Sequence, residues 1–154
     1  MYKILIGSPV KQKSAILKEF LQGLEAAEKG QHEITYYFVD DNTEAASSEL
    51  LKQFAEKNEV IIKKGSSLFD AVADYDGHVW HATNLEKVTV YKNKIISHCI
   101  ENGFDYLFLI DSDIVIDKRS MLQLLSDQVD IVSNVFWTQW RKNGILTPTN
   151  RLSV

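Results

Sequence analysis

The chain has 154 residues, 45% hydrophobic and 25% charged, which is typical of a single globular domain with a sizeable core, here residues 1–154. Its formal net charge of -4 at pH 7 argues against a general affinity for nucleic acid. The only cysteine, Cys99, excludes an internal disulfide, and its place on an apolar helical face predicts a buried thiol. No apolar stretch is long enough for a membrane span or a signal peptide, so we expect a cytoplasmic protein without a transmembrane segment.

The apolar patterns of the chain predict strands and helices in alternation. Strands are predicted over residues 3–6, 33–39, 60–62 and 106–110, and a further strand is predicted to begin at residues 130–133 and to run toward Phe136. Helices are predicted over residues 14–29, 47–57, 86–102 and 118–126. Gly7-Ser8-Pro9 is expected to end the first strand, and Ile16 is expected on the buried face of the first helix. This order predicts an α/β fold in which a mostly parallel open sheet carries helices on both faces.

Two stretches lack such a pattern. Residues 65–85 indicate a long loop, in which His78 and His81 are weak candidates for ligand binding. After Trp140 the chain turns polar and rich in structure breakers, so no further element is expected there. The rings of Trp137 and Trp140 suit contact with a sugar or an acceptor, and a place in the core or in an interface is the equal alternative.

The strand predicted over residues 106–110 is a continuous apolar run that ends directly in Asp111-Ser112-Asp113. A run without polar alternation predicts a strand covered on both faces at the centre of the sheet. Carboxylates at such a boundary need water, a hydrogen-bond donor or a cation. Because Mg²⁺ and Mn²⁺ prefer oxygen ligands, Asp111 and Asp113 are candidate ligands for a divalent metal that carries a phosphate group. The alternative is that these acids only cap turns, the role we expect for Asp117 before the next helix.

Two other predicted strands also end in residues that suit a ligand site. Asp40 and Asp41 follow the second strand, and Pro9 follows the first. In a parallel sheet the carboxyl ends of the strands lie at one edge, where open α/β sheets bind their ligands. We therefore expect one site built from all three strand ends.

Four segments in this order resemble the GT-A nucleotide-diphospho-sugar transferases, especially the family-2-like glycosyltransferases. These segments are Gly7-Ser8-Pro9, Phe38-Val39-Asp40-Asp41-Asn42, Tyr91-Lys92-Asn93 and Leu109-Ile110-Asp111-Ser112-Asp113. The resemblance covers about the first 135 residues, the nucleotide-binding half of that fold. An Asp-x-Asp motif alone is weakly specific, so the resemblance depends on all the signals together.

The resemblance implies a metal-dependent glycosyltransferase that uses a nucleotide-diphospho-sugar donor, with uridine as the expected nucleoside. Asp113 and Asp111 match the acids that hold Mn²⁺ or Mg²⁺, which stabilises the leaving nucleotide as charge develops. Asp41 matches the acid that accepts a hydrogen bond from the base, a role that Asp40 could share. Nucleotide contacts are also implied for Pro9, Lys92, Asn93 and Asp111, and Lys92 stands where Arg is commoner.

The resemblance leaves the acceptor side of the reaction open. In this family the catalytic base and the acceptor site lie beyond the Asp-x-Asp half, in a part that we expect this chain mostly to lack. No base is therefore named, and the acceptor is a saccharide, a lipid or a protein. An incomplete domain with exposed tryptophans favours self-association, so a homo-oligomer is expected.

Two other interpretations use the same residues. In a haloacid-dehalogenase-like phosphatase, Asp111 would be the covalent nucleophile and Asp113 the acid/base. That motif normally opens its domain, whereas here several predicted elements precede it, so we discount this interpretation. The remaining alternative is a non-catalytic module or fragment that binds a nucleotide sugar without transferring it.

Overall fold

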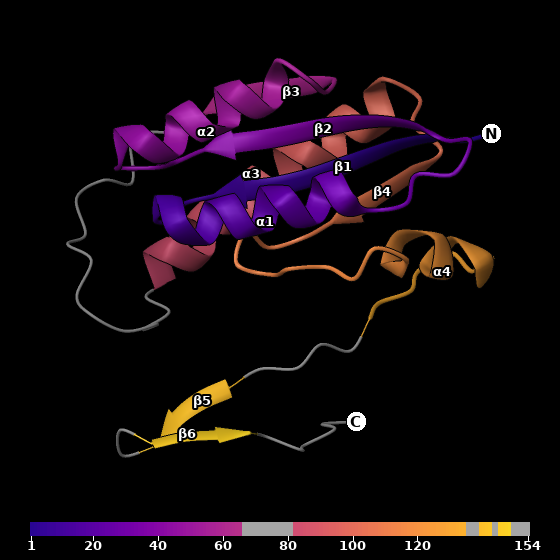
Figure 1. Cartoon of the computed structure of the whole chain (residues 1–154). Coiled ribbons are helices and arrows are strands. Elements are labelled where there is room, and N and C mark those ends of the chain that lie inside the picture. The colour runs from indigo at the N-terminus through magenta and orange to yellow at the C-terminus, as the bar shows by residue number, and fades with distance from the viewer. Residues whose placement is uncertain (66–81, 135–138, 143–144, 149–154) are drawn as a thin grey trace.

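The sheet and its helices follow the alternation that the sequence predicts (Figure 1). The computed structural model describes residues 1–65, 82–134, 139–142 and 145–148. Its main sheet has four parallel strands in the order β3-β2-β1-β4. These strands are β1 (Lys3–Val10), β2 (Glu33–Asp40), β3 (Val60–Lys64) and β4 (Tyr106–Leu109). The described residues therefore confirm an α/β fold with an open parallel sheet.

Helices cover both faces of this sheet, because successive side chains along each strand point to opposite faces. Helices α1 (Ser14–Ala26) and α2 (Ala45–Ala55) pack on one face, and α3 (Ala82–Glu101) packs on the other (Figure 1). Helix α4 (Ser120–Ser126) follows β4. The first face buries Ile4, Ile6, Leu17, Phe20, Tyr36, Phe38 and Leu51, and the second buries Leu5, Tyr37, Val39, Tyr91, Ile95 and Cys99. The thiol of Cys99 is thus buried, as predicted. None of the described helices is long and apolar enough to cross a membrane.

The prediction that Ile16 lies on the buried face of α1 is wrong, because this side chain is 44% exposed. The residues of α1 that the sheet buries are Leu17, Phe20, Leu21, Gly23 and Leu24. The apolar stripe of α1 is therefore wider than the strip of helix surface that contacts the sheet, and Ile16 lies at the border of that stripe.

Strand β1 continues through Gly7-Ser8-Pro9 to Val10, although the sequence predicted that this tripeptide would end it. The carbonyls of Lys3 and Gly7 accept hydrogen bonds from the amides of Asp105 and Ile110, so the odd-numbered residues of β1 face β4. Pairing with β4 ends at Gly7, whereas pairing with β2 continues to Val10. The missing N–H of Pro9 therefore faces a side where no strand pairs with it, and the ladder loses no hydrogen bond.

Helix α3 packs closely on β1 at Gly7. A Cβ atom at this position would overlap the side chain of Ile95. The absence of a side chain at Gly7 therefore allows the helix to approach the strand, and Ile95 is fully buried in this contact. This contact lies along α3 between its buried residues Tyr91 and Cys99.

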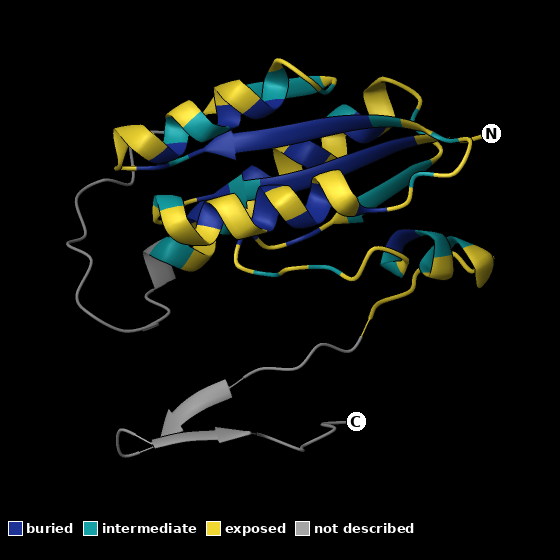
Figure 2. Ribbon diagram, viewed as in Figure 1, coloured by how far each residue is buried: buried dark blue, intermediate teal, exposed yellow. Residues whose placement is uncertain are grey.

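Strand β4 is flanked by β1 alone among the described residues, so the prediction of a central strand is corrected. Its residues are half-buried, and Leu109 is 38% exposed, whereas β1 and β2 are buried along most of their length (Figure 2). Tyr106 and Phe108 pack against the core on one face, and Leu107 packs against the core on the other. The apolar run therefore predicted correctly that both faces of β4 are covered. It does not predict how many strands pair with β4.

The strand predicted to begin at residues 130–133 is not formed over these residues, and the end of the prediction toward Phe136 lies outside the described residues. The structure has no strand there, and Ile131 is 92% exposed. Val129 and Val132 lie near β4 and line a cavity with Leu107 and Met121, without entering the sheet. A short β-branched run favours a strand only where it also finds a partner, so the local pattern was insufficient.

A small antiparallel hairpin follows, where the sequence predicted no further element. It consists of β5 (Gln139–Lys142) and β6 (Ile145–Pro148), in which Gln139 pairs with Pro148. The residues between the strands are Asn143-Gly144, a dipeptide that favours two-residue hairpin turns. The two strands have only four residues each, too few to show a clear alternating pattern in the sequence.

Candidate functional site

The predicted acids lie at one edge of the sheet. Strands β1, β2 and β4 are parallel, so their carboxyl ends point in the same direction. Val10 lies beside Asp40 in the register, and Gly7 lies beside Leu109. Three side chains of α3 then reach the acids that follow β2 and β4: Lys87, Tyr91 and Lys92.

Asp41 is held by two side chains of α3. The ammonium Nζ of Lys87 lies 2.8 Å from Oδ2 of Asp41, and the hydroxyl of Tyr91 donates to Oδ1 at 3.1 Å. The side chains of Asp41 and Lys87 are only 12% and 9% exposed. Lys87 and Tyr91 are four residues apart on one helix, so they lie on the same face of α3. The carboxylate of Asp41 is therefore oriented by the protein itself.

Gly65, which follows β3, completes the surroundings of Asp41. Its amide donates to the carbonyl of Asp40 at 2.8 Å. A Cβ atom at this position would lie 2.5 Å from Oδ1 of Asp41 and 2.8 Å from the hydroxyl of Tyr91. Only a residue without a side chain leaves room for the hydrogen bond between Tyr91 and Asp41.

Asp40 has a local role in the turn that follows β2. Its Oδ1 accepts from the amide of Asn42 at 3.1 Å and from Nδ2 of Asn42 at 2.8 Å. The side chain of Asn42 in turn accepts from the amide of Gln12 at 2.8 Å. Nζ of Lys64 lies 3.9 Å from Oδ2 of Asp40. These contacts join the loops after β1 and β2, and they make Asp40 a support of the site.

Glu44 also fixes the loop between β1 and α1. Its carboxylate accepts from the amide of Ser14 at 2.7 Å and from the hydroxyl of Ser47 at 3.1 Å. The hydrogen bond from the Ser14 amide is the main cause that lowers the pKa of Glu44. The carbonyl of Gln12 lies 2.8 Å from the same buried hydroxyl, so the single proton of Ser47 is shared between this carbonyl and the carboxylate of Glu44. The loop beside Pro9 is therefore fixed by hydrogen bonds to the segment that follows β2.

The acids after β4 are exposed. Nζ of Lys92 lies 2.9 Å from Oδ1 of Asp111, and these side chains are 35% and 58% exposed. The amide of Ile114 donates to the carbonyl of Asp111 at 3.1 Å, which closes a turn around the buried Ser112. Asp113 is exposed on this turn. The carboxylates of Asp111 and Asp113 can therefore reach a ligand or a cation from solvent.

The carboxylates of Asp111 and Asp113 are exposed at the end of a strand, and their oxygens are of the ligand type that a divalent ion prefers. The described residues include no group of three or more acidic, His or Cys side chains able to hold a metal. A metal at this turn would thus need other ligands, such as water or the oxygens of a bound phosphate.

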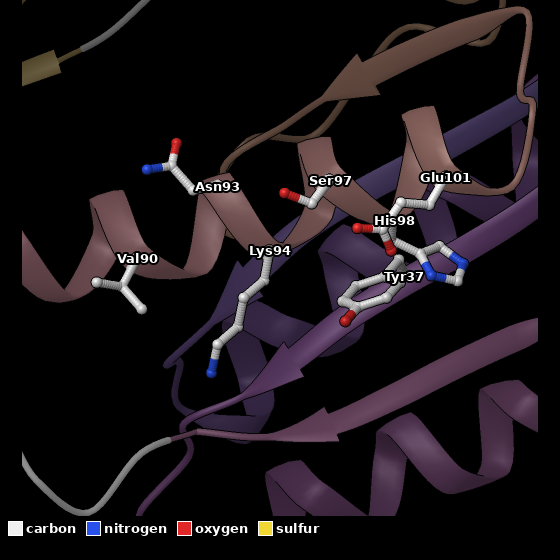
Figure 3. Close-up of a pocket in the computed structure, with 7 residues that line it drawn as sticks. All are labelled: Tyr37, Val90, Asn93, Lys94, Ser97, His98 and Glu101. Atoms are coloured by element: carbon white, nitrogen blue, oxygen red, sulfur yellow. The ribbon is translucent and has the colours of Figure 1, made fainter.

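Pro9 and Asn93 are placed differently by the structure. Pro9 is partly exposed near the end of β1, and its contact with a nucleoside stays a prediction. Asn93 instead lines an open groove of about 480 Å³ along α3 (Figure 3). The groove is lined by Tyr37, Val90, Asn93, Lys94, Ser97, His98 and Glu101. Among the described contacts none joins Asn93 to the strand-end acids, so its nucleotide contact stays a prediction.

Some candidate residues lie outside the described residues. They are His78, His81 and Trp137. Trp140 lies in β5, and its sugar contact stays a prediction.

Lys87 contacts one of the candidate acids, although the sequence did not single it out. It occupies the same helical face as Tyr91, Ile95 and Cys99, at intervals of four residues, and it is 7% exposed. A lysine is almost never fully buried unless it is paired. Its position in an otherwise buried stripe was therefore the signal for an acidic partner, which the structure identifies as Asp41.

Comparisons with known proteins give no family assignment. No family model matches the sequence, and no curated protein matches it. The structure is similar to the crystal structure of S. aureus TarS 1-349, with 13% sequence identity and a TM-score of 0.49. The match covers 80% of this chain and 31% of that chain, so this chain spans less than a third of its length. A likeness this distant carries no argument about function, which has to be inferred from the site.

Proposed function

We propose that this chain binds a nucleotide-diphospho-sugar at the shared strand edge and transfers the sugar in a metal-dependent reaction, as a GT-A-type glycosyltransferase. One observation carries the proposal. Asp41, the candidate for binding the base, and Asp111, a candidate for binding the metal, both contact α3, through Lys87 and Lys92 respectively. Acids suited to the two ends of a nucleotide diphosphate thus lie along one helix at the ligand-binding edge of the sheet.

At the nucleoside end, Asp41 offers an oriented acceptor for a ring N–H group. Uracil carries such a group, so a uridine nucleotide is the proposed donor. Pro9 lies partly exposed near the same edge and would pack against the ring or the ribose. Asp40 supports the turn after β2 through its bonds to Asn42, and contacts the ligand less directly.

At the phosphate end, Asp111 and Asp113 would hold Mn²⁺ or Mg²⁺ together with oxygens of the ligand. The metal would neutralise charge on the leaving diphosphate. Lys92 lies 2.9 Å from Asp111 and supplies a second positive charge at the same place. A lysine binds phosphate as a point charge, so Lys92 can contact the diphosphate without a fixed geometry.

A non-catalytic module is the second candidate, because the site described so far contains recognition groups and no assigned general base. Binding and turnover distinguish the two functions. Release of the sugar from a uridine-diphospho-sugar in the presence of acceptors supports a transferase, and binding without release supports a module. A missing general base alone typically costs a factor of about 10²–10⁴ in rate.

Titration calorimetry with uridine diphosphate, in Mn²⁺ and in chelator, tests the proposed site. We expect binding in Mn²⁺, and we expect Asp113→Ala to lose the metal dependence and most of the affinity. Asp117→Ala is the matched control, since Asp117 is an exposed acid on the same segment that accepts from the amide of Arg119. Equal binding by wild type and Asp113→Ala, or tighter binding of adenosine diphosphate, would contradict the proposal.

A further inference from the structure

The contacts of Asp41 restrict which bases it can recognise. Each of its two oxygens already accepts from one donor, Oδ2 from Lys87 and Oδ1 from Tyr91. Both donors come from one face of α3, one helical turn apart. A bidentate ligand would therefore have to share both oxygens of Asp41 with donors that the protein already supplies.

Gly65 adds to this restriction. Its backbone lies so close to Oδ1 that even a Cβ atom would be 2.5 Å away. Gly65 therefore restricts access to Oδ1, the oxygen that also accepts from Tyr91. One ligand N–H needs a free position on only one oxygen of this carboxylate, whereas two adjacent N–H groups need a free position on both oxygens at once.

We propose that Lys87 and Tyr91 are positioning residues that make Asp41 a single-donor acceptor, so that the site favours uracil, with one ring N–H, over guanine, with two adjacent N–H donors. This inference rests on the proposed nucleotide-binding function. It assigns the discrimination among bases to the two α3 side chains that orient Asp41. Lys87 holds the carboxylate in place, and the hydroxyl of Tyr91 occupies the second oxygen.

The test measures binding of uridine diphosphate and guanosine diphosphate, each with Mn²⁺, to the full chain. Tyr91→Phe removes one hydroxyl and keeps the buried ring, so it frees Oδ1. We expect the affinity for guanosine diphosphate relative to uridine diphosphate to rise about tenfold, the usual effect of one hydrogen bond to a charged group. Tyr37→Phe is the control, because Tyr37 is buried on the same face of the sheet but contacts His98. The relative affinity of Tyr37→Phe for guanosine diphosphate and uridine diphosphate should equal that of wild type.

Lys87 is tested separately by rescue. Lys87→Met should weaken binding of both nucleotides, and Lys87→Arg, which keeps the charge, should recover at least part of the affinity for uridine diphosphate. A ratio that stays unchanged in Tyr91→Phe, while wild type binds uridine diphosphate with metal, would overturn this inference and leave the proposed function standing. Failure of wild type to bind any nucleotide diphosphate would overturn both.

Discussion

Strands β2 and β4 each end in acids at the same edge of the sheet, but the two sets of acids are stabilised in different ways. After β2, Asp41 is nearly buried and is bound by Lys87 and Tyr91. After β4, Asp111 is exposed and is bound by Lys92, which is itself partly exposed. A buried carboxylate without a partner is costly, so its partner must come from the protein. An exposed carboxylate can exchange its lysine for water or for a cation. The position of Asp41 after β2 is therefore fixed by the protein, whereas the partner of Asp111 after β4 can change.

The largest expected effect comes from removing one lysine from each pair. Lys87→Met should lower the free energy of unfolding by about 3–5 kcal/mol, because it leaves the Asp41 carboxylate buried without its charged partner. Lys92→Met is the matched variant and should cost less than about 1 kcal/mol, because its pair is exposed to solvent. Urea unfolding of both variants measures the difference. Similar losses in the two variants would show that burial does not separate the two ends.

An intermediate effect on stability is expected at alkaline pH, because Tyr36 of β2 is buried. Burial, with a smaller contribution from the charge of Glu25, raises the pKa of Tyr36 from 10.0 to about 12. The unfolded chain loses this proton near pH 10, whereas the folded chain keeps it up to about pH 12. Stability is therefore complete below pH 10 and falls as the pH rises from 10 to 12, by about 2–3 kcal/mol in total.

Unfolding at a series of alkaline pH values measures this loss. Tyr36→Phe is the control, and its stability should lack this contribution to the decline between pH 10 and 12. The hydroxyl of Tyr36 donates to the carbonyl of Leu24 at 3.4 Å, a long hydrogen bond whose loss should add little to the effect of the substitution. Identical pH profiles for the two proteins would mean that Tyr36 is not the group responsible.

The smallest expected effect compares two glycines. Gly65→Ala places a methyl group against Asp41 and Tyr91, so we expect a loss of about 1–3 kcal/mol from overpacking, together with weaker nucleotide binding. Gly103, at the end of α3 before β4, has a φ of +65° and open space around it. Gly103→Ala should cost about 1 kcal/mol through backbone strain alone. Thermal unfolding and nucleotide titration on both variants separate these causes, and a binding defect in Gly103→Ala would contradict the comparison.

The sequence was sufficient to predict the parts of the fold that depend on local periodicity. The apolar repeats of α1 and α3 and the buried runs of β1 and β2 gave the correct elements and a parallel sheet. It also placed Asp41 and Asp111 at strand ends, because an acid that directly follows an apolar run has few other places to lie.

The features that the sequence did not predict depend on contacts between segments far apart in the chain. The continuation of β1 through Pro9 follows from where β4 stops pairing, and the edge position of β4 follows from its neighbours. The pair of Lys87 with Asp41 joins a helix to a loop far away in the chain. Periodicity marks such a lysine as buried, but it does not identify the acid that it binds.

The close contact between Gly7 and Ile95 lies on the same helix that binds the acids at both strand ends. Helix α3 rests on β1 at this point, and the same helix carries Lys87 and Lys92. A tilt of α3 about this contact would move both lysines together relative to their acids. A side chain at position 7 would push against Ile95, so we expect it to disturb the lysine contacts of both strand ends together, although their acids follow different strands.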